Sequence, residues 1–284
     1  GFCDFHDNFT LQKEKWLDVL IDMRQSIAHR GNDQTGEYLG ENIGLAHTRL
    51  SIRDVAGGMQ PMRRCADGND YVIVYNGEIY NFASLREELI LAGHTFVTHC
   101  DSEVLLHGYE QYGGCELVKK LRGMFAFVIW DKNEKKLFGA RDMFGIKPFY
   151  YTTTKEGEFM FASEIKSMLA HPHFERAVNK NALLPYLTFQ YSATEETFFA
   201  GVYKLPPAHC FEWKDGEFTK ERYWDVNFDA KEGTLEEFSN ALDETVHASV
   251  AAHKISDVPV GSFLSGGVDS SYITACLMPD KTFS

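Results

Sequence analysis

Three polar groups between residues 47 and 103 stand beside apolar stretches and have complementary chemistry. Arg49 lies in HTRLSIRD (47–54), and a guanidinium grips a carboxylate through two parallel hydrogen bonds. Asp101 in THCDSE offers a carboxylate that accepts from an ammonium group. Asn76 and Gly77 in VYNGEIYN offer a side-chain amide and a backbone N–H that together form an oxyanion hole. Together these groups suit a free α-amino acid. Taken singly, they are a surface ion pair, a helix N-cap and a tight turn with positive φ at glycine.

A second group, rich in hydroxyls and glycine, follows an apolar stretch near the end of the chain. In FLSGGVDSS, Gly266 and Gly267 allow the backbone to approach a phosphate closely. The hydroxyls of Ser265, Ser270 and Ser271, with the free N–H groups of a helix start, donate to such a group. The stretch lacks the GK[ST] of a Walker loop, so a P-loop ATPase is not indicated. An ordinary strand-to-helix loop with a serine cap is the simpler alternative.

The cysteines give little sign of a metal or redox site. Cys3 stands two residues behind Gly1, which raises the question of a reactive thiol near an amino terminus. The six cysteines are scattered and none forms a CxxC pair, so we predict no metal site. An even count alone is weak support for disulfides in a chain of this size. We expect free thiols in a reducing cytoplasm.

Composition excludes several classes of protein. Of 284 residues, 44% are hydrophobic and 24% charged, which is typical of a globular chain. The formal net charge of −13 argues against nucleic acid as a partner, because a phosphate backbone needs a basic face. No apolar run approaches 18 residues, so we expect no membrane span.

Hydrophobic periodicity predicts the elements that position these groups. Helices are predicted near 11–28, 82–92 and 101–112. Gly31 and Gly93 follow the first two as stop signals, and Asp101 and Ser102 are N-cap candidates for the third. Strands are predicted at 42–52, 71–75, 123–131, 135–142, 148–151 and 157–164. Many strands with few helices between them favour layered antiparallel sheets with helices outside.

The second part of the chain has a different pattern of predicted elements. The stretch WKDGEF (213–218) is a hairpin signal within a connecting region, and apolar spacing predicts a long helix over 234–253. An apolar strand, the glycine-rich turn and a new helix follow, and KTFS begins another strand. We therefore predict three segments: 1–190, a connecting segment with a small ribbon at 191–228, and the start of an α/β domain at 229–284.

Several motifs resemble a known family and keep its order. HRGNDQTG, HTRLSIRD, YNGEIYN, CDSE, GMFAFVIWD, ARDMFGIKPFYY and FASEIKS are similar to the glutaminase domain of class II glutamine amidotransferases, most of all that of glutamine-hydrolysing asparagine synthetases. The resemblance implies an α+β fold, an N-terminal-nucleophile αββα sandwich. Asn76 and Gly77 would stabilise the oxyanion. The implied glutamine-binding residues are Arg49, Leu50, Ile52, Asn76, Gly77, Glu78 and Asp101.

The stretch FLSGGVDSS is similar to the PP-loop of ATP pyrophosphatases, an α/β domain that would be incomplete here. The resemblance implies ATP, with a contact mediated by Mg²⁺ near Asp269. PRPP amidotransferase, glutamate synthase and glucosamine-6-phosphate synthase share the glutaminase but carry no PP-loop after it. The implied ATP-binding residues are Phe263, Leu264, Ser265, Gly266, Gly267, Val268, Asp269, Ser270 and Ser271.

The two resemblances together imply an ATP-dependent ligase. It would form asparagine from aspartate, through an acyl-adenylate, with ammonia from glutamine; glutamine, aspartate and ATP are the implied partners. A homodimer stays open as the assembly. One alternative is a related amidotransferase acting on another carboxylate, since the acceptor site lies outside this sequence. The other is a non-catalytic scaffold, which should have lost Arg49, Asn76, Gly77 or Asp101.

The family's nucleophile is a cysteine at the mature amino terminus, whose own α-amine serves as base. Aligned with the family start Cys-Gly-Phe, Gly1 is the second residue, so the nucleophile is expected immediately before Gly1. As printed, the chain would bind but not hydrolyse glutamine. Cys3 is not expected to be the nucleophile. The nitrogen of Gly1 is expected near Arg49, Asn76 and Gly77.

Overall fold

The computed structural model describes residues 1–66, 68–192 and 194–284, and these form two compact units. The first unit comprises Gly1–Ser51 and Val55–Asp225, and the second comprises Ile52–Asp54 and Val226–Ser284. The segment boundaries expected from the sequence, at 190 and 228, stay a prediction.

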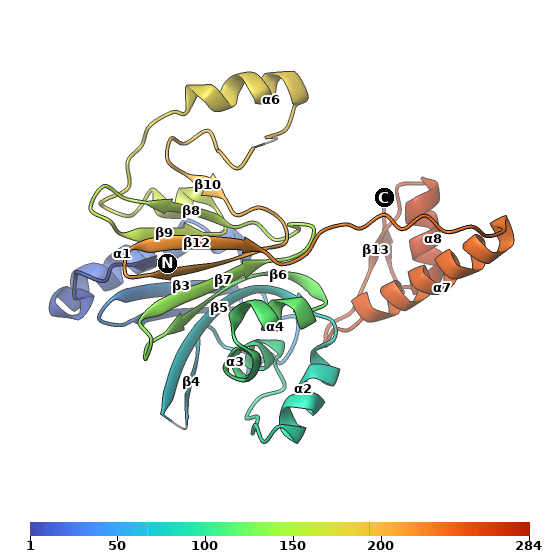
Figure 1. Cartoon of the computed structure of the whole chain (residues 1–284), viewed down its shortest axis with the longest axis horizontal. Helices are drawn as coiled ribbons and strands as arrows, with labels where there is room; N and C mark the ends of the chain where they lie inside the picture. Colours follow the sequence, from blue (N-terminus) through green and yellow to red (C-terminus); the bar gives the residue numbers. More distant parts are fainter. Residues whose placement is uncertain (67, 193) are drawn as a thin grey trace. The chain divides into compact units, whose positions relative to one another are not determined.

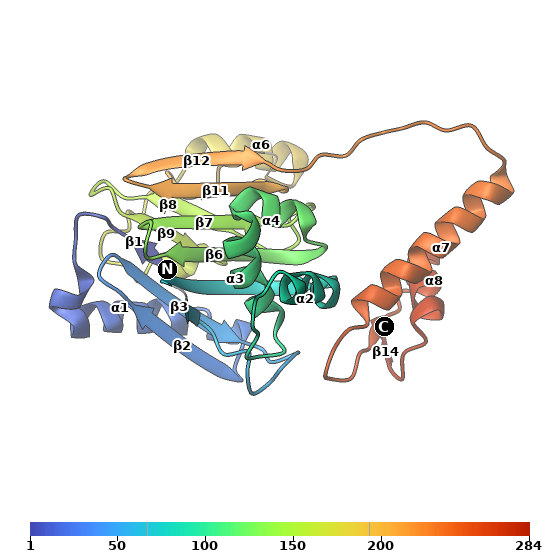
Figure 2. The same ribbon diagram turned by 60° about the horizontal axis from the view of Figure 1, so that its bottom comes forward.

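Two six-stranded antiparallel sheets form the body of the first unit (Figures 1 and 2). Sheet A has the order β10 (Tyr203–Lys204), β8 (Tyr150–Thr153), β9 (Phe159–Ala162), β1 (Phe2–Cys3), β3 (Ile43–Arg49) and β2 (Gln34–Leu39). Sheet B has the order β12 (Glu217–Arg222), β11 (His209–Lys214), β7 (Lys136–Arg141), β6 (Gly123–Asp131), β5 (Asn69–Ile79) and β4 (Met62–Ala66).

Strand β6 shows why these sheets pack face to face. Along GMFAFVIWD, Phe125 and Phe127 belong to one buried cluster, and the alternate residues Ala126 and Val128 belong to another. Side chains alternate across a strand, so β6 is buried on both faces. The unbroken apolar run from Met124 to Trp130 is the kind of sequence that this environment requires.

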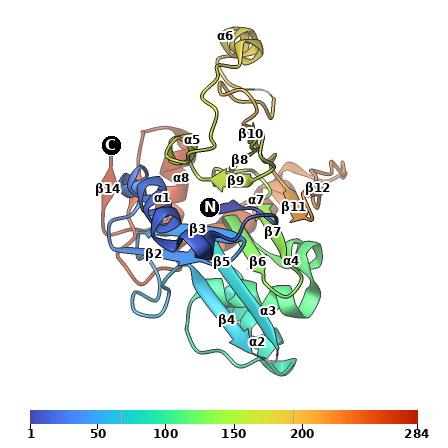
Figure 3. The same cartoon turned by 90° about the vertical axis from the view of Figure 1, so that its left-hand side faces the viewer.

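The buried clusters define four layers. The inner cluster joins β6 to Phe159 of β9 and Leu45 of β3, so it lies between the sheets. The outer cluster joins sheet B to α2 (Phe82–Leu91), α3 (Asp101–Tyr112) and α4 (Gly114–Lys120). On the far face of sheet A, Trp16 and Leu20 of α1 (Lys13–Gln25) pack against Phe2. The first unit is therefore an αββα sandwich, which confirms the predicted fold class (Figure 3).

The remaining helical elements of the first unit are short. They are η1 (Phe9–Gln12), η2 (Ala28–Arg30), α5 (Ile165–Met168), η3 (Lys180–Ala182) and α6 (Leu183–Phe189).

The first helix of the second unit is the predicted long helix, α7 (Leu235–His253). Its start is fixed by a capping box, in which the Thr234 hydroxyl accepts from the Glu237 N–H and the Glu237 carboxylate accepts from the Thr234 N–H. Strand β13 (Ser262–Phe263) then leads through α8 (Val268–Leu277) to β14 (Thr282–Phe283). Because β13 and β14 pair in parallel, this is a β–α–β start of an α/β domain, as predicted.

Most predicted elements are confirmed in kind, with shifted boundaries. Strand β6 and helix α3 match the predicted 123–131 and 101–112. The predicted helix 11–28 is shorter, because η1 precedes α1 and η2 follows it. Strands β1, β2, β4 and β10 and helices α4, α5 and α6 were not predicted. Helix α4 begins at Gly114, directly after Gly113, which ends α3.

The ribbon predicted within residues 191–228 is present, and it belongs to the first unit. Strands β11 and β12 form a hairpin, and β11 also pairs with β7 from Lys214↔Lys136 to Cys210↔Ala140. The hairpin therefore extends sheet B of the sandwich, alongside β7 in Figure 2.

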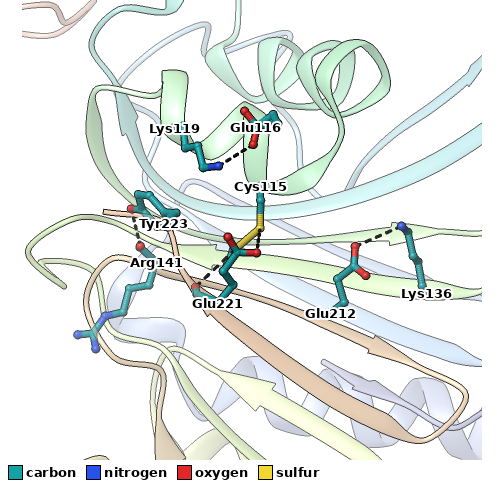
Figure 4. Close-up of a disulfide and its surroundings, with 9 residues drawn as sticks. Cys115, Glu116, Lys119, Lys136, Arg141, Glu212, Glu221 and Tyr223 are labelled. Atoms are coloured by element: carbon teal, nitrogen blue, oxygen red, sulfur yellow. Dashed lines mark hydrogen bonds and ion pairs between the residues drawn. A yellow bond between two sulfur atoms is a disulfide. The ribbon is translucent and has the colours of Figure 1, made fainter. Parts of the chain in front are cut away.

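The expectation that all cysteines are free thiols is wrong in the structure. Cys115 of α4 and Cys210 of β11 form a disulfide with their Cα atoms 6.5 Å apart, and the Glu221 carboxylate lies beside it (Figure 4). Their separation of 95 residues along the chain gives no local signal for this pairing. Cys3, Cys65, Cys100 and Cys276 are free.

Among the described residues, no helix combines the length and the apolar character that crossing a bilayer would require.

The inner core should dominate the stability of the sandwich. Phe159 is fully buried and stacks on Trp213 with ring centroids 5.0 Å apart. Phe159→Ala is expected to lower the free energy of unfolding by about 3–5 kcal/mol, because it leaves a cavity between the sheets. The matched control Phe228→Ala, at a position 92% exposed, should change it by less than about 0.5 kcal/mol. Urea unfolding of the whole chain measures both, and equal losses would contradict the assigned core.

Candidate active site

Arg49 is the last residue of β3, and its side chain is buried. Its Nη1 donates to Gln34 Oε1 at 2.7 Å and to the Val55 carbonyl at 3.3 Å. Gln34 lies directly opposite on β2. The guanidinium is therefore a fixed cation in the wall of the site, and the alternative of a surface ion pair is wrong.

Asn76 and Gly77 lie inside β5, so the predicted tight turn at Asn-Gly is wrong. The strand continues to Ile79 and stays paired with β6, with Gly77 opposite Phe125. A Cβ at Gly77 would lie 2.1 Å from the Met124 carbonyl oxygen, so glycine is required by close approach and not by a positive φ. The Asn76 Nδ2 is buried and has no acceptor among the described residues. Such an unmade hydrogen bond costs about 1–3 kcal/mol.

Asp101 is the first residue of α3 and is 4% exposed. The N-cap position is Cys100, so the predicted caps at Asp101 and Ser102 are wrong. Asp101 Oδ2 accepts from the Tyr75 hydroxyl at 2.8 Å and from the Ile79 N–H at 3.0 Å. These two bonds fasten the carboxylate to β5 on either side of Asn76 and Gly77. Its Oδ1 lies 3.5 Å from the Cys100 thiol.

The neighbours of Asp101 are held in defined protonation states. Burial, and then the charge of Asp101, raises the pKa of Tyr75 well above its usual value, so the phenol stays a hydrogen-bond donor. Burial also raises the pKa of the Cys100 thiol to about 11, so the thiol stays protonated.

Two further contacts bring the separate motifs together. A Cβ at Gly58 would lie 2.2 Å from Arg49 Nη2 and 3.0 Å from Cys100 Sγ, so Arg49 and the start of α3 meet across this glycine. The His47 Nε2 donates to the Tyr75 carbonyl at 3.0 Å and links β3 to β5. The structure therefore brings Arg49, the Asn-Gly pair and Asp101 to one region, at β3, β5 and the start of α3.

Four residues of this region were missed in the sequence: His47, Gly58, Gln60 and Tyr75. His47 and Tyr75 stand within the same motifs as Arg49 and Asn76, which is the signal that could have found them. The side chain of Gln60 is buried, and its Oε1 accepts from the Tyr75 N–H at 2.6 Å.

The other predicted pocket residues differ in exposure and in the unit to which they belong. Leu50 follows β3 and is 60% exposed, and Glu78 is half-buried on β5. Ile52 groups with the second unit by its contacts, so the structure does not add it to the site of the first unit.

The start of the chain lies in the middle of sheet A (Figure 3). The Gly1 nitrogen donates to the Phe161 carbonyl at 2.8 Å, and burial lowers its pKa to about 5. In the register that pairs Phe2 with Gly44, a residue joined to Gly1 would lie opposite Ala46, three positions from Arg49. The nearness of Gly1 to Asn76 and Gly77 stays a prediction.

Cys3 has the environment of a core residue. It is fully buried between the sheets. Burial, with the charges of Asp4 and Glu158, raises the pKa of its thiol well above the usual value. A protonated, inaccessible thiol is a poor nucleophile.

In the second unit, the glycine-rich loop forms an open turn between β13 and α8. No atom lies within 4 Å of a Cβ placed on Gly266. The Ser265 and Ser270 hydroxyls are 3.0 Å apart. In the described part of this unit, the N–H groups of Val268 and Asp269 have no acceptor, as is usual at a helix start. Open backbone, paired hydroxyls and free N–H groups fit a phosphate. The other candidates on this strand, loop and first turn are Phe263, Leu264, Gly267 and Ser271.

Comparison with known proteins shows the family of the chain. The family model described as "Glutamine amidotransferase domain" matches residues 2–224, so the chain belongs to that family. A second family model, "Asparagine synthase", matches residues 241–282.

The curated relatives extend the likeness over nearly the whole chain. "Asparagine synthetase [glutamine-hydrolyzing] 1" of Bacillus subtilis is 44% identical over 277 residues, which cover 97% of this chain and 43% of the relative. A putative asparagine synthetase of Methanocaldococcus jannaschii is 33% identical, over 97% of this chain and 56% of its own length. "Amidase chry2" of Gibberella zeae is 35% identical, over 90% of this chain and 38% of its own length. The chain thus spans about half the length of these relatives or less.

Among solved structures, an allosteric regulatory enzyme of purine biosynthesis is similar with a TM-score of 0.49 and 17% identity, over 86% of this chain and 52% of that chain.

His47 should make stability depend on pH. Burial lowers its pKa to about 4; the bond to the Tyr75 carbonyl opposes this shift, and the Arg49 charge adds to it. The unfolded chain binds a proton at His47 below about pH 6.5 and the native chain only below about pH 4, so stability falls as pH falls between these values. His47→Gln keeps a donor and removes the titration.

Between about pH 6.5 and pH 4, the free energy of unfolding should fall in both proteins. We expect the fall to be roughly 1–3 kcal/mol smaller in His47→Gln than in the parent, as measured by urea unfolding. Since other titrating groups are common to both proteins, the difference reports His47. The exposed His6→Gln serves as control and should follow the parent. Parallel curves for parent and His47→Gln would refute the neutral, buried state.

Proposed function

We propose that the first unit hydrolyses glutamine to glutamate and ammonia. The observation that carries the proposal is the buried Asn76 Nδ2, a donor without an acceptor among the described residues. It adjoins Gly77 in the wall that Arg49 and Asp101 share. An amide under nucleophilic attack develops an oxyanion, which would supply the missing acceptor.

The neighbouring charges suit the two ends of a free amino acid. Arg49 would bind the α-carboxylate through its guanidinium. Asp101 has Oδ2 committed to Tyr75 and Ile79, and we assign the α-ammonium to Oδ1, which also accepts from the Cys100 thiol at 3.5 Å. By the family resemblance, Leu50, Ile52 and Glu78 complete the pocket.

The nucleophile we propose is a cysteine joined directly to Gly1. Such a residue would continue β1 beside β3 toward Arg49, by the register described above. Its own α-amine, with an ordinary pKa of about 7.7–8.0, would serve as the base. In that protein the nitrogen of Gly1 is an uncharged amide, which suits its buried bond to Phe161.

The second unit, completed by the length that the relatives have beyond this chain, would use the ammonia. We propose that it binds ATP at the glycine-rich loop, with Mg²⁺ near Asp269, and amidates aspartate to asparagine through an acyl-adenylate, in the cytoplasm. The open backbone at Gly266 and the free N–H groups of α8 support phosphate binding.

A second acceptor remains a candidate because a relative bears another name. "Amidase chry2" matches 90% of this chain at 35% identity, so a protein similar over most of this chain is not named as an asparagine synthetase. Amidation of another carboxylate is therefore the alternative. A scaffold without catalysis is disfavoured, since Arg49, Asn76, Gly77 and Asp101 are all present.

Glutamine hydrolysis by a protein that carries a mature amino-terminal cysteine before Gly1 tests the first proposal. Asn76→Ala is expected to lower kcat by about 10²–10³ with little change in KM, because the oxyanion donor acts in the transition state. Arg49→Lys is expected to raise KM, because lysine cannot grip a carboxylate with two parallel bonds. A glutamate-release assay measures both.

Asn133→Ala, an exposed asparagine in the β6–β7 turn, is the matched control and should keep parental kinetics. No glutamate release from the parent, or an Asn76→Ala variant with parental kcat, would overturn the assignment.

Product analysis of the full-length protein tests the acceptor. With glutamine, ATP and Mg²⁺, we expect mass spectrometry to detect asparagine formed from aspartate. Ser265→Ala should weaken ATP binding while glutamate release continues. If other carboxylic acids are amidated and aspartate is not, the alternative acceptor is correct. If glutamate is released and no offered acid is amidated, the ligase proposal fails and the glutaminase proposal stands.

A further inference from the structure

Three side chains with no part in the proposed reaction converge beside a cavity of about 790 Å³ in the first unit. His94 follows α2, and His107 and Glu110 lie on α3. The His94 and His107 Nδ1 atoms are 3.1 Å apart, and Glu110 Oε2 lies 3.5 Å from His94 Nδ1. We call these three residues the His–His–Glu cluster.

The local sequence explains why these atoms meet. Helix α2 ends in a Schellman motif: Gly93, at φ +102°, donates to the Ile90 carbonyl, and the His94 N–H donates to the Leu89 carbonyl. This motif fixes His94 directly after the helix. His107 and Glu110 are three residues apart and so share one face of α3. The cluster is thus built on rigid elements, with His107 only 1% exposed and His94 11%.

Outer partners assign the ring proton of each histidine to Nε2. Gln111 Oε1 accepts from His94 Nε2 at 2.9 Å. His107 Nε2 faces Glu103 Oε1 at 3.6 Å. The Glu103 carboxylate accepts from the Val97 N–H at 2.8 Å and from the N–H and the hydroxyl of Thr98 at 2.7 and 2.6 Å. An ionised carboxylate only accepts, so the proton of His107 belongs on Nε2. Two Nδ1 lone pairs then face each other.

We propose that the His–His–Glu cluster is a binding site for a divalent transition metal of the Zn²⁺ class. Two nitrogens bound to one Zn²⁺ at about 2.0–2.1 Å with tetrahedral angles lie roughly 3.3 Å apart, close to the spacing here. Glu110 supplies the third ligand, and the cavity leaves room for water as the fourth. The carboxylate and amide on the Nε2 atoms are the outer partners that metal-bound histidines usually have.

Two polar side chains orient the carboxylate of Glu110. Asn69 Nδ2 donates to Oε1 at 2.7 Å, and Arg64 Nη1 lies 2.6 Å from Oε2. They hold the carboxylate toward the histidines. The charge of Arg64 also repels a cation, so we expect binding weaker than at an all-cysteine structural zinc site.

The other two groups of metal-ligand spacing in the described residues fail the same test. In the group of Glu158, His171 and His173, the His171 Nδ1 accepts from the His173 N–H at 3.3 Å. The proton of His171 therefore sits on Nε2, the atom that would have to bind the metal. In the third group, Cys115 and Cys210 are joined as a disulfide.

A metal at this cluster would tie the loop after α2 to α3, the helix that carries Asp101 at its start. Its role is positional, because no member of the cluster belongs to the site of Arg49, Asn76 and Asp101. Metal binding therefore succeeds or fails independently of the proposed glutamine hydrolysis.

Zinc titration of the whole chain, stripped with EDTA, tests the proposal by calorimetry. We expect one Zn²⁺ per chain, with affinity reduced about 100-fold or more in His94→Ala and about 10-fold or more in Glu110→Gln. His99→Ala, an exposed histidine in the same loop, is the control and should bind like the parent. Zinc should raise the melting temperature of the parent and of His99→Ala, and not that of His94→Ala.

Circular dichroism without metal verifies that each variant is folded, and both variant sites are partly exposed, which makes misfolding a small risk. Co²⁺ should give the visible absorption of a tetrahedral site in the parent and lose it in His94→Ala. The proposal is overturned if the parent binds no zinc, if His94→Ala binds zinc like the parent, or if His173→Ala abolishes binding. If the parent binds no zinc, the side-chain amide of Gln111 has the opposite orientation, so that its NH₂ donates to His94 Nε2. The His94 Nδ1–H then donates to His107 Nδ1.

Discussion

The bond pair from Asp101 to β5 is the interaction on which the site depends. One carboxylate oxygen accepts from the Tyr75 hydroxyl and the Ile79 N–H, and the strand between them carries Asn76 and Gly77. The same contact fixes the start of α3 over sheet B. Since Tyr75 is also bonded through its backbone to His47 and Gln60, β3, β5 and α3 share one polar network. A buried network of this kind is rigid when every member is satisfied, and among the described residues Asn76 Nδ2 and His47 Nδ1 are members left without a partner.

Sequence patterns predicted the elements whose apolar residues form a clear local pattern. Strand β6 and helix α3 could be located to the residue, because apolar runs bounded by glycine or charge specify them locally. Strands β1, β2 and β4 could not, since they are short or polar and exist through pairing with partners far along the chain. At Asn76 and Gly77 the local sequence favours a turn, but nine residue pairs between β5 and β6 keep this segment in the strand.

The candidate site was foreseen in part. Arg49, Asn76, Gly77 and Asp101 could be named from residue type and motif, and the structure brings them together. The contributions of His47, Gly58 and Gln60 depend on atoms that meet only across strands and loops. The pairing of Cys115 with Cys210 is of the same kind, because α4 and β11 become neighbours only through sheet B. Long-range contacts of this kind have no periodic signature in a single sequence.

The two-sided burial of β6 limits how this fold can vary in length. Its alternate residues serve different cores, so one inserted residue would move every side chain beyond it to the opposite face. The aromatic residues of the outer core would then point between the sheets, and the smaller Ala126 and Val128 would face the helices. Insertions are therefore tolerable at the β6–β7 turn and not within the strand. Family members that differ in length should differ at such turns, while β6 keeps its number of residues.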